Sequence, residues 1–163
     1  MVRVLSKTLS GVWVNGHSVK SFDRPGKSPG LLIELDEPES LSVEKAILIF
    51  DSGAALDSLS LKGQFVAVTA SENAEAIKLL KKKKIPAITC GMSSKDTVSL
   101  SSRGEGSACV CIQREIEALS GQRVEPREVA VKYEGELSEY SIMAATVTLM
   151  LCGALPENNS IEL

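Results

Sequence analysis

The stretch Phe65–Ser102 decides the fold, and it reads FVAVTASENAEAIKLLKKKKIPAITCGMSSKDTVSLSS. The short apolar runs Phe65–Thr69 and Ile85–Cys90 are typical of strands that are covered on both faces. Between them, apolar residues recur with helical spacing. A strand–helix–strand unit of this length makes a right-handed parallel crossover. We therefore expect an α/β fold whose mixed sheet contains one parallel strand–helix–strand unit.

The helix in this stretch carries its own start and stop signals. Thr69 and Glu72 have the spacing of a capping box, and Ser71 is a competing cap. Four lysines at 81–84 close the helix, where positive charge complements the carbonyl end of the helix dipole. Pro86 cannot continue the helix. We interpret the lysine run as a solvated helix end.

The residues that follow change from continuous apolar runs to alternation. Residues 96–102 alternate, a glycine turn follows, and residues 107–113 form the return strand. The run 124–131 is interrupted by Pro126, which favours an edge strand. These three segments predict an antiparallel meander. The last helix, expected over residues 138–151, is apolar nearly all round, which predicts a buried C-terminal helix.

The chain of 163 residues suits one domain with a small extension. Apolar runs at Leu31–Leu35 and Ala46–Phe50 are further strand candidates. We expect N-terminal strands and a loop over residues 1–45, packed on a main α/β domain at residues 46–155. A tail at residues 156–163 follows.

Composition excludes several classes of protein. Lys and Arg total 18 against 21 for Asp and Glu, and the net charge of -3 argues against a dedicated nucleic-acid binder. The N-terminal residues do not resemble a signal peptide, and no apolar run approaches the ~20 residues that span a bilayer. We expect a cytoplasmic protein that binds neither nucleic acid nor membrane.

The chain has four cysteines, Cys90, Cys109, Cys111 and Cys152, and none of them forms a Cys-x-x-Cys pair. The single histidine, His17, lies far from them in sequence. A zinc site needs closer-spaced ligand pairs, so we expect no metal site and interpret the thiols as free and buried.

The N-terminal region contains one hairpin signal and one triplet that only partly matches a phosphate-binding motif. Asn15-Gly16 is typical of a two-residue β-turn between strands. The triplet Gly26-Lys27-Ser28 invites comparison with a phosphate-binding P-loop, which needs a glycine five positions earlier and a helix afterwards. Ser21 occupies the glycine position, and Pro29-Gly30 breaks any following helix. We therefore reject a P-loop.

The order of the motifs in the later part of the chain carries a family resemblance. Ile88-Thr-Cys-Gly is followed by an alternating strand, the turn Arg103-Gly-Glu-Gly-Ser, a second strand, Val129-Ala-Val and a helix. This order resembles the later half of the central domain of Mur ligases, the ATP-dependent enzymes that add amino acids to the peptidoglycan precursor. The resemblance covers about residues 46–155, and further positions that match the family pattern are Gly135, the small pair Ala144-Ala145 and the strand Ile47–Asp51.

The chain departs from that family where the family contacts nucleotide. Leu137 and Ser138 stand where Mur ligases have His-Asn, and Ser141 replaces a second Asn. The family's P-loop, metal-binding residues and modified lysine lie upstream, in a region without a counterpart here. The resemblance therefore implies the family's scaffold without its ligase activity, and we expect no cofactor.

The best candidate for a binding site is the loop after residue 90, at the carboxyl end of a strand, where open α/β sheets bind ligands. Glycine lets the backbone turn, hydroxyl groups could donate to an anion, and one lysine supplies charge. The alternative is a plain turn at the serines, with Asp96 already starting a strand. The candidate ligand-binding residues are Gly91, Ser93, Ser94, Lys95 and Thr97.

Three classes of function remain open. We expect a non-catalytic Mur-ligase-like protein that binds a small ligand or a protein partner, with a link to cell-envelope metabolism by analogy only. The alternatives are a structural or assembly domain and a small enzyme with an unrecognised site. No catalytic residue can be assigned, because no nucleophile–base pair and no paired carboxylates show motif spacing.

Overall fold

The computed structural model describes residues 2–6, 13–14, 17–18, 31–35, 39–50, 59–118, 120–153 and 159–163, with side chains described from residue 39 onward. The chain divides into two compact units. Unit 1 comprises Met1–Thr69 and Asn73–Ala87, and unit 2 comprises Ala70–Glu72 and Ile88–Leu163. The rejected P-loop triplet Gly26-Lys27-Ser28 lies outside the described residues.

Unit 1 is built on a mixed sheet in the order β4-β1-β5-β6. β1 is antiparallel to both β4 and β5, whereas β5 and β6 are parallel. β2 pairs with β3 and with the first residues of β5, so Val14 lies opposite His17 and the predicted turn at Asn15-Gly16 falls between them, outside the described residues. The strands are β1 Val2–Ser6, β2 Trp13–Val14, β3 His17–Ser18, β4 Leu31–Leu35, β5 Ser40–Phe50 and β6 Ser60–Ala70.

A close approach between β5 and β6 shapes one end of this sheet. The register of the pair shifts between Ser42 and Lys45 of β5. Gly63 of β6 lies opposite this irregularity with φ +126°, and a Cβ there would collide with the carbonyl oxygen of Val43. Only glycine satisfies both the backbone conformation and the space.

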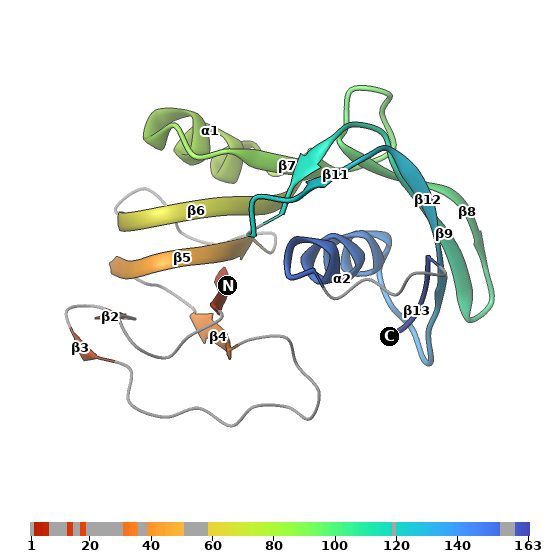
Figure 1. Ribbon diagram of the computed structural model, residues 1–163, viewed down its shortest axis with the longest axis horizontal. Helices are drawn as coiled ribbons and strands as arrows, with labels where there is room; N and C mark the ends of the chain where they lie inside the picture. The colour runs from red at the N-terminus through yellow and green to blue at the C-terminus, as the bar shows by residue number, and fades with distance from the viewer. Residues whose placement is uncertain are drawn as a thin grey trace. The chain divides into compact units, whose positions relative to one another are not determined.

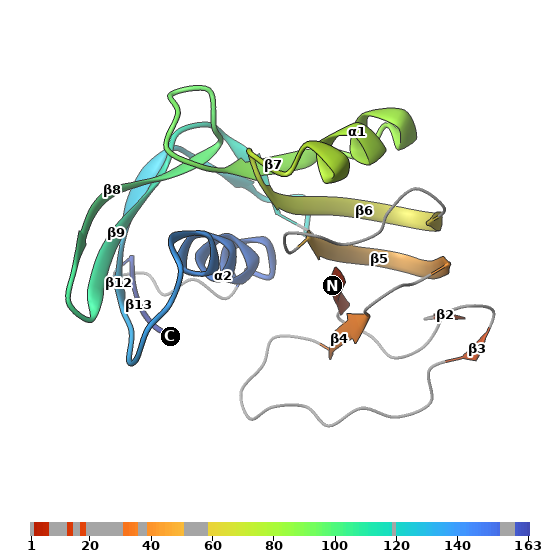
Figure 2. The same ribbon diagram turned by 180° about the vertical axis from the view of Figure 1, so that it is seen from behind.

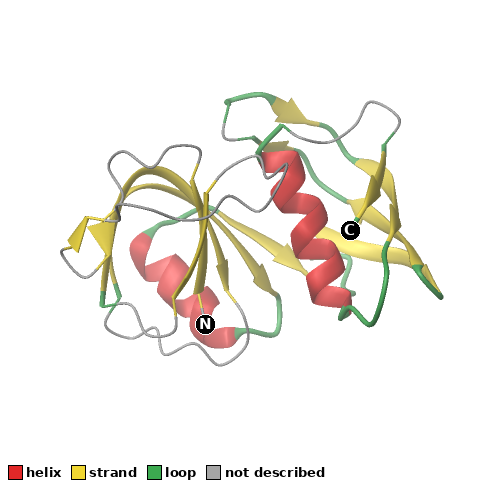
Figure 3. Ribbon diagram, turned by 90° about the horizontal axis from the view of Figure 1, so that it is seen from below, coloured by secondary structure: helices red, strands yellow, loops and turns green. Residues whose placement is uncertain are grey.

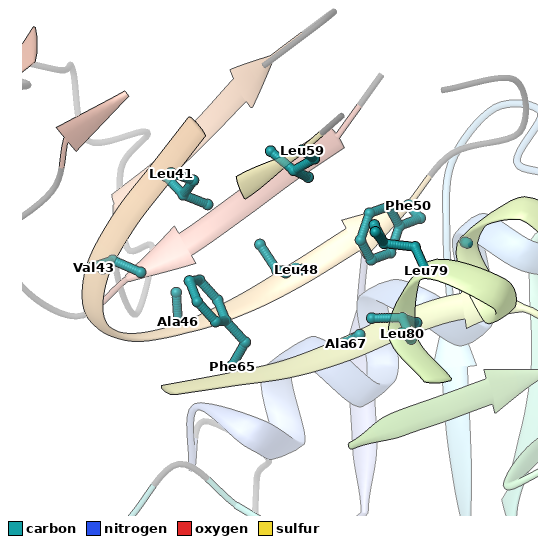
Figure 4. Packing of buried hydrophobic residues seen from close by; sticks show 11 residues of the cluster. Leu41, Val43, Ala46, Leu48, Phe50, Leu59, Phe65, Ala67, Leu79 and Leu80 are labelled. Atoms are coloured by element: carbon teal, nitrogen blue, oxygen red, sulfur yellow. The ribbon is translucent and has the colours of Figure 1, made fainter. Parts of the chain in front are cut away.

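The core of unit 1 is apolar and lies between the strands and the helix α1 (Ala74–Lys83) (Figure 4). Phe50 and Leu80 are almost fully buried there, together with Leu48 and Ala67. α1 contributes Ala76, Leu79 and Leu80 to this cluster and leaves its other face exposed. The spacing of these three residues places them on one face, and its burial adds to the high helix propensity of the Ala, Glu, Leu and Lys residues of α1.

The start of α1 differs from the sequence prediction. Its N-cap is Asn73, whose side-chain oxygen accepts a hydrogen bond from the Ala76 N–H at 3.1 Å. The predicted caps at Thr69 and Ser71 are wrong, because β6 continues to Ala70 and displaces the helix start. At the other end, Lys84 adopts the left-handed conformation of a C-cap with φ 55°.

Backbone hydrogen bonds confirm the parallel crossover around α1. The Ala67 N–H donates to the Pro86 carbonyl at 2.9 Å, and the Ser71 N–H donates to the Cys90 carbonyl at 2.9 Å. Both members of the second bond lie four residues further along the chain than those of the first. The two segments therefore run in the same direction, as a strand–helix–strand unit requires.

Unit 2 contains the antiparallel meander. Its strand order is β13-β12-β9-β8-β7, in which β9 is antiparallel to β8 and to β12, and β7 and β8 are parallel. β10 and β11 form a separate two-stranded hairpin. The strands are β7 Ala87–Cys90, β8 Val98–Gly104, β9 Ser107–Ile112, β10 Ile116–Glu117, β11 Arg123–Val124, β12 Arg127–Lys132 and β13 Ser160–Glu162.

The predicted edge position of the last meander strand is wrong. β12 is flanked by β9 on one side and by the parallel strand β13 on the other. Pro126 lies between β11 and β12, where its missing N–H costs no ladder hydrogen bond. Ile161 anchors β13 with an exposed fraction of 5%.

Helix α2 (Glu139–Leu151) packs on β8, β9 and β12 and lies in the concavity of their curved sheet (Figures 1 and 2). It crosses these strands at an angle when seen from below (Figure 3). Ser138 caps the helix by accepting a hydrogen bond from the Ser141 N–H at 3.0 Å. Two buried or half-buried threonines, Thr146 and Thr148, donate to carbonyls one turn earlier, so their hydroxyl groups need no further partner.

The predicted α/β class is confirmed: the structure contains a mixed sheet, a parallel strand–helix–strand unit, an antiparallel meander and a buried C-terminal helix. The expected divisions at residues 45/46 and 155/156 remain predictions; β5 runs across the first, and β13 lies beyond the second. No helix in the part of the chain that the structure describes is long and apolar enough to cross a bilayer.

Replacing Val147 by Asp should unfold unit 2. Val147 of α2 is fully buried, and a carboxylate there would lose its hydration without gaining a partner. We expect the free energy of unfolding to fall by at least about 3 kcal/mol in urea titrations followed by circular dichroism. Ser141→Asp adds the same charge to an exposed position of α2 and should leave stability near that of the wild type. Equal stability of the two variants would contradict the burial of α2.

Candidate functional site

The predicted site is a loop of unit 2 that joins β7 to β8. The two strands meet at Cys90 and Val98, and the Gly91 N–H donates to the Val98 carbonyl at 3.0 Å. At the far side of the loop, the Thr97 N–H donates to the Thr89 carbonyl at 3.0 Å. Both ends of the loop are therefore fixed to the strands that it connects.

Asp96 organises the interior of this loop. Its side chain is buried, with an exposed fraction of 3%, and Oδ2 accepts a hydrogen bond from the Ser93 N–H at 2.9 Å. The Asp96 N–H in turn donates to the Ser93 carbonyl at 2.9 Å, and Ser93 Oγ accepts from the Lys95 N–H at 3.2 Å. The side chain of Asp96 therefore already occupies the position in which the backbone amides of the loop would otherwise bind an external anion.

Gly91 is required by the position of this carboxylate. A Cβ on Gly91 would lie 2.5 Å from Asp96 Oδ2 and would also collide with Ser71 Oγ. The glycine thus makes room for the side chains of Asp96 and Ser71 behind the loop. Its role is close packing rather than direct contact with a ligand.

The residues just after β9 clamp the loop from outside. Gln113 Nε2 donates to Ser99 Oγ at 2.7 Å and approaches the Ser93 carbonyl at 3.5 Å. The guanidinium of Arg114 donates to the Ser94 carbonyl at 3.3 Å. The next residue, Glu115, does not neutralise Arg114, because its carboxylate forms an ion pair with Arg123 at 3.2 Å.

The structure separates the predicted site residues into two groups. Gly91 and Ser93 hold the loop together, whereas Ser94 and Lys95 are exposed at its outer surface. Thr97 is half-buried where the loop meets β8. The neighbouring Met92 is one of two large apolar side chains that are well exposed in the described part of the chain, with an exposed fraction of 65%.

Sequence reasoning missed the two residues that define the charge of this loop. Asp96 was expected to begin a strand if the loop were a plain turn, but β8 begins at Val98 and Asp96 turns inward. No local signal in the sequence marks Arg114. It lies beside the loop because the register of β8 and β9 places Val98 opposite Ile112.

The thiols near the site are poor nucleophiles. Burial, with a smaller contribution from the Asp96 charge, raises the pKa of the Cys90 thiol to about 12. Burial and the nearby charges of Glu128 and Cys109 also raise the pKa of Cys111. A thiol must ionise to attack or to bind a metal ion, so neutral pH leaves both unreactive. Cys90 and Cys152 are buried as predicted, whereas Cys109 and Cys111 are only half-buried, and none of the four forms a disulfide.

A metal site does not arise from the described residues, where no group of three or more His, Cys, Asp or Glu side chains is placed to hold an ion. Leu137, Ser138 and Ser141, which the expected resemblance matches to nucleotide-contacting positions, have structural roles in this chain. The Leu137 carbonyl accepts a hydrogen bond from the Arg103 guanidinium at 2.7 Å, and Ser138 and Ser141 are occupied in the cap of α2.

Comparisons with known proteins provide no relative. No protein-family model matches the chain, and neither a curated protein nor a solved structure is significantly similar to it. Evidence for a function therefore comes from the geometry of the loop.

Gly91→Ala should destabilise unit 2. The added methyl group would press on Asp96 and Ser71, and relieving the collision would break the hydrogen bond between Ser93 and Asp96. We expect a loss of about 1–3 kcal/mol in the free energy of unfolding, measured by urea titration. Gly104→Ala is the matched control, because its Cβ would only meet the flexible Ser107 Oγ at 3.2 Å. A Gly91→Ala variant as stable as the control would show that Asp96 does not fill this space.

Proposed function

We propose that this chain is a non-catalytic, Mur-ligase-like protein that binds an anionic ligand at the outer surface of the loop formed by residues 91–97. The observation that carries the proposal is the separation of charge at this loop. The carboxylate of Asp96 is buried inside, whereas Lys95 and Arg114 remain outside. Glu115, the acid next to Arg114 in sequence, forms its ion pair with Arg123 instead.

The chemistry of the exposed groups suits a carboxylate or a phosphate. A guanidinium has five N–H donors, and Arg114 gives one of its nitrogens to the Ser94 carbonyl. The remaining donors can form charge-assisted hydrogen bonds with a planar anion. Lys95 adds a second positive charge, Ser94 can add a hydroxyl donor, and the exposed Met92 offers an apolar contact.

The loop is also pre-organised, which reduces the entropy lost on binding. Hydrogen bonds from Ser93, Thr97 and Gln113 fix its backbone before any ligand arrives. A rigid site needs less of its interaction energy for ordering.

Several features support a binding role rather than catalysis. Leu137 and Ser138 replace the His-Asn pair that the Mur ligase resemblance would require, and Ser138 is committed to capping α2. Cys90 beside the loop stays protonated at neutral pH because burial raises its pKa to about 12. The resemblance suggests nucleotides and peptidoglycan precursors as the first ligands to examine, and with them a link to cell-envelope metabolism.

A thermal-shift screen with inorganic phosphate, nucleotides and peptidoglycan precursors tests the proposal. A ligand present at about 100 times its Kd should stabilise the protein by about 2.7 kcal/mol and raise its melting temperature. Lys95→Ala and Arg114→Ala should each reduce this shift, because each removes a positive charge from the loop surface. Lys132→Ala removes a lysine from β12 and should bind like the wild type.

The same samples separate binding from turnover. We expect no ATP hydrolysis with magnesium, with or without amino acids and peptidoglycan precursors. ATP hydrolysis that is lost in Lys95→Ala would instead favour the alternative of a small enzyme at this loop. A full screen without any shift would favour the other alternative, a structural or assembly domain, and would contradict a ligand site at the loop.

A further inference from the structure

The exposed side of α1 in unit 1 is a surface made almost entirely of lysines. Lys78, Lys81 and Lys82 lie at i, i+3 and i+4, so they share one side of the helix. Lys83 and the C-cap Lys84 extend this surface beyond the last turn. All five side chains are exposed, and together they are called the lysine face below.

The stability of the helix explains only part of this surface. Positive charge in the last turn of α1 complements the helix dipole, but the effect fades within one turn and does not reach Lys78. Lys78 and Lys82 are like charges at i and i+4, an arrangement that destabilises a helix. The helix contains a single acid, Glu75, and in the described part of the chain none of the five lysines has an ion-pair partner. An external anionic partner would offset the repulsion between these lysines.

Unit 2 carries an acidic surface at the turn between β8 and β9. Glu105 lies in this turn, and the segment after β12 is held against it, because the Tyr133 hydroxyl donates to the Gly104 carbonyl at 3.0 Å. The Tyr133 N–H also donates to the Gly106 carbonyl at 3.0 Å, which brings Glu134 and Glu136 beside the turn. These three exposed glutamates form the acidic surface.

Arg103, at the end of β8, is engaged outside this surface. Its guanidinium donates to the Leu137 carbonyl at 2.7 Å and lies 3.7 Å from the carboxylate of Glu139. Arg103 is thereby paired with a different acid. Glu105 remains exposed in the turn, and Glu134 and Glu136 remain exposed on the segment that the hydrogen bonds of Tyr133 hold against it.

The composition of the lysine face favours a protein carboxylate surface over other anionic partners. Phosphate groups in nucleic acids are recognised best by the planar fork of arginine, and bases need aromatic side chains on which to stack. The lysine face contains neither kind of residue. Insertion into a lipid surface needs an apolar side, but α1 buries its apolar residues Ala76, Leu79 and Leu80 in the core of unit 1.

We propose that the lysine face of one copy docks on the acidic surface of a second copy of this chain. Because the contact joins two different surfaces, two copies can form it twice across a two-fold axis, or form it once and continue as a ring or a filament. This inference is independent of ligand binding at the 91–97 loop, whose residues take no part in it.

Sedimentation velocity over a range of protein concentrations tests the proposal. At low ionic strength the average mass should rise with concentration, and it should fall to that of the monomer in about 1 M salt, where the Debye length is about 3 Å. The double variant Lys78→Glu/Lys82→Glu should weaken association at least roughly tenfold, and so should Glu134→Lys/Glu136→Lys. Circular dichroism of each variant checks that it is folded.

Charge exchange makes the test specific. Mixing the two double variants, or combining all four substitutions in one chain, restores opposite charges across the contact and should restore association. The control Glu117→Lys/Glu125→Lys changes the net charge by the same amount as Glu134→Lys/Glu136→Lys. Its two positions lie near the other end of β9, away from the acidic surface, so this variant should associate like the wild type. Rescue by charge exchange would not follow from a general change in net charge.

Three outcomes would overturn the proposal. The first is a wild-type protein that stays monomeric at every concentration in low salt. The second is association that both charge reversals leave unchanged. The third is a monomer that co-sediments with vesicles of acidic lipid and loses this binding in Lys78→Glu/Lys82→Glu, which would assign the lysine face to a membrane surface instead.

Discussion

The hydrogen bond from the Ser93 N–H to the buried carboxylate of Asp96 is the interaction on which the loop of unit 2 depends. A buried polar group is costly unless it has partners, so the loop must fold around this side chain. Three features follow from that constraint. Gly91 lacks a side chain because Asp96 and Ser71 fill the space. The pKa of Cys90 rises, chiefly through burial and also through the nearby charge. The cations Lys95 and Arg114 are left on the outside, where a ligand can reach them.

An internal carboxylate changes what kind of ligand site the loop can be. Glycine loops at the ends of strands usually bind anions through backbone amides. Here the amides of Ser93 and Lys95 are already used, so the exposed side chains must supply much of the affinity for an external anion. Side-chain sites of this kind depend on guanidinium and ammonium groups, whose contribution is screened by salt when they are exposed. The proposed site suits reversible recognition better than the tight enclosure that phosphoryl transfer needs.

The parts of the fold that the sequence predicted well are those that depend on local periodicity. Residues 31–35 form β4 as expected, and α2 covers 139–151 against an expected 138–151, because continuous or helical apolar spacing is set by burial alone. Prediction failed for strands whose existence or length depends on hydrogen-bonding partners that are distant in sequence. β13 is too short to show a period and exists because it pairs with β12. β6 extends back to Ser60 through a polar segment because β5 provides its hydrogen bonds, and Gly63 fits only because of the bend in β5.

The sequence predicts the loop between β7 and β8, whereas it does not predict the arrangement of charges in that loop. Gly91 and the hydroxyl residues mark the end of a strand, and that is a local signal. The direction in which Asp96 points depends on the space behind Gly91, which is bounded by Ser71 in the segment before α1.

The placement of Arg114 depends on the register of β8 and β9, which shifts by one residue at an irregularity between Leu100 and Ser102. A one-residue shift exchanges the two faces of a strand, so the sequence alone leaves open which side chain after β9 meets the loop. The cation opposite Ser94 is therefore a product of tertiary register, and a change in that register would alter the site even if every residue of the loop stayed the same.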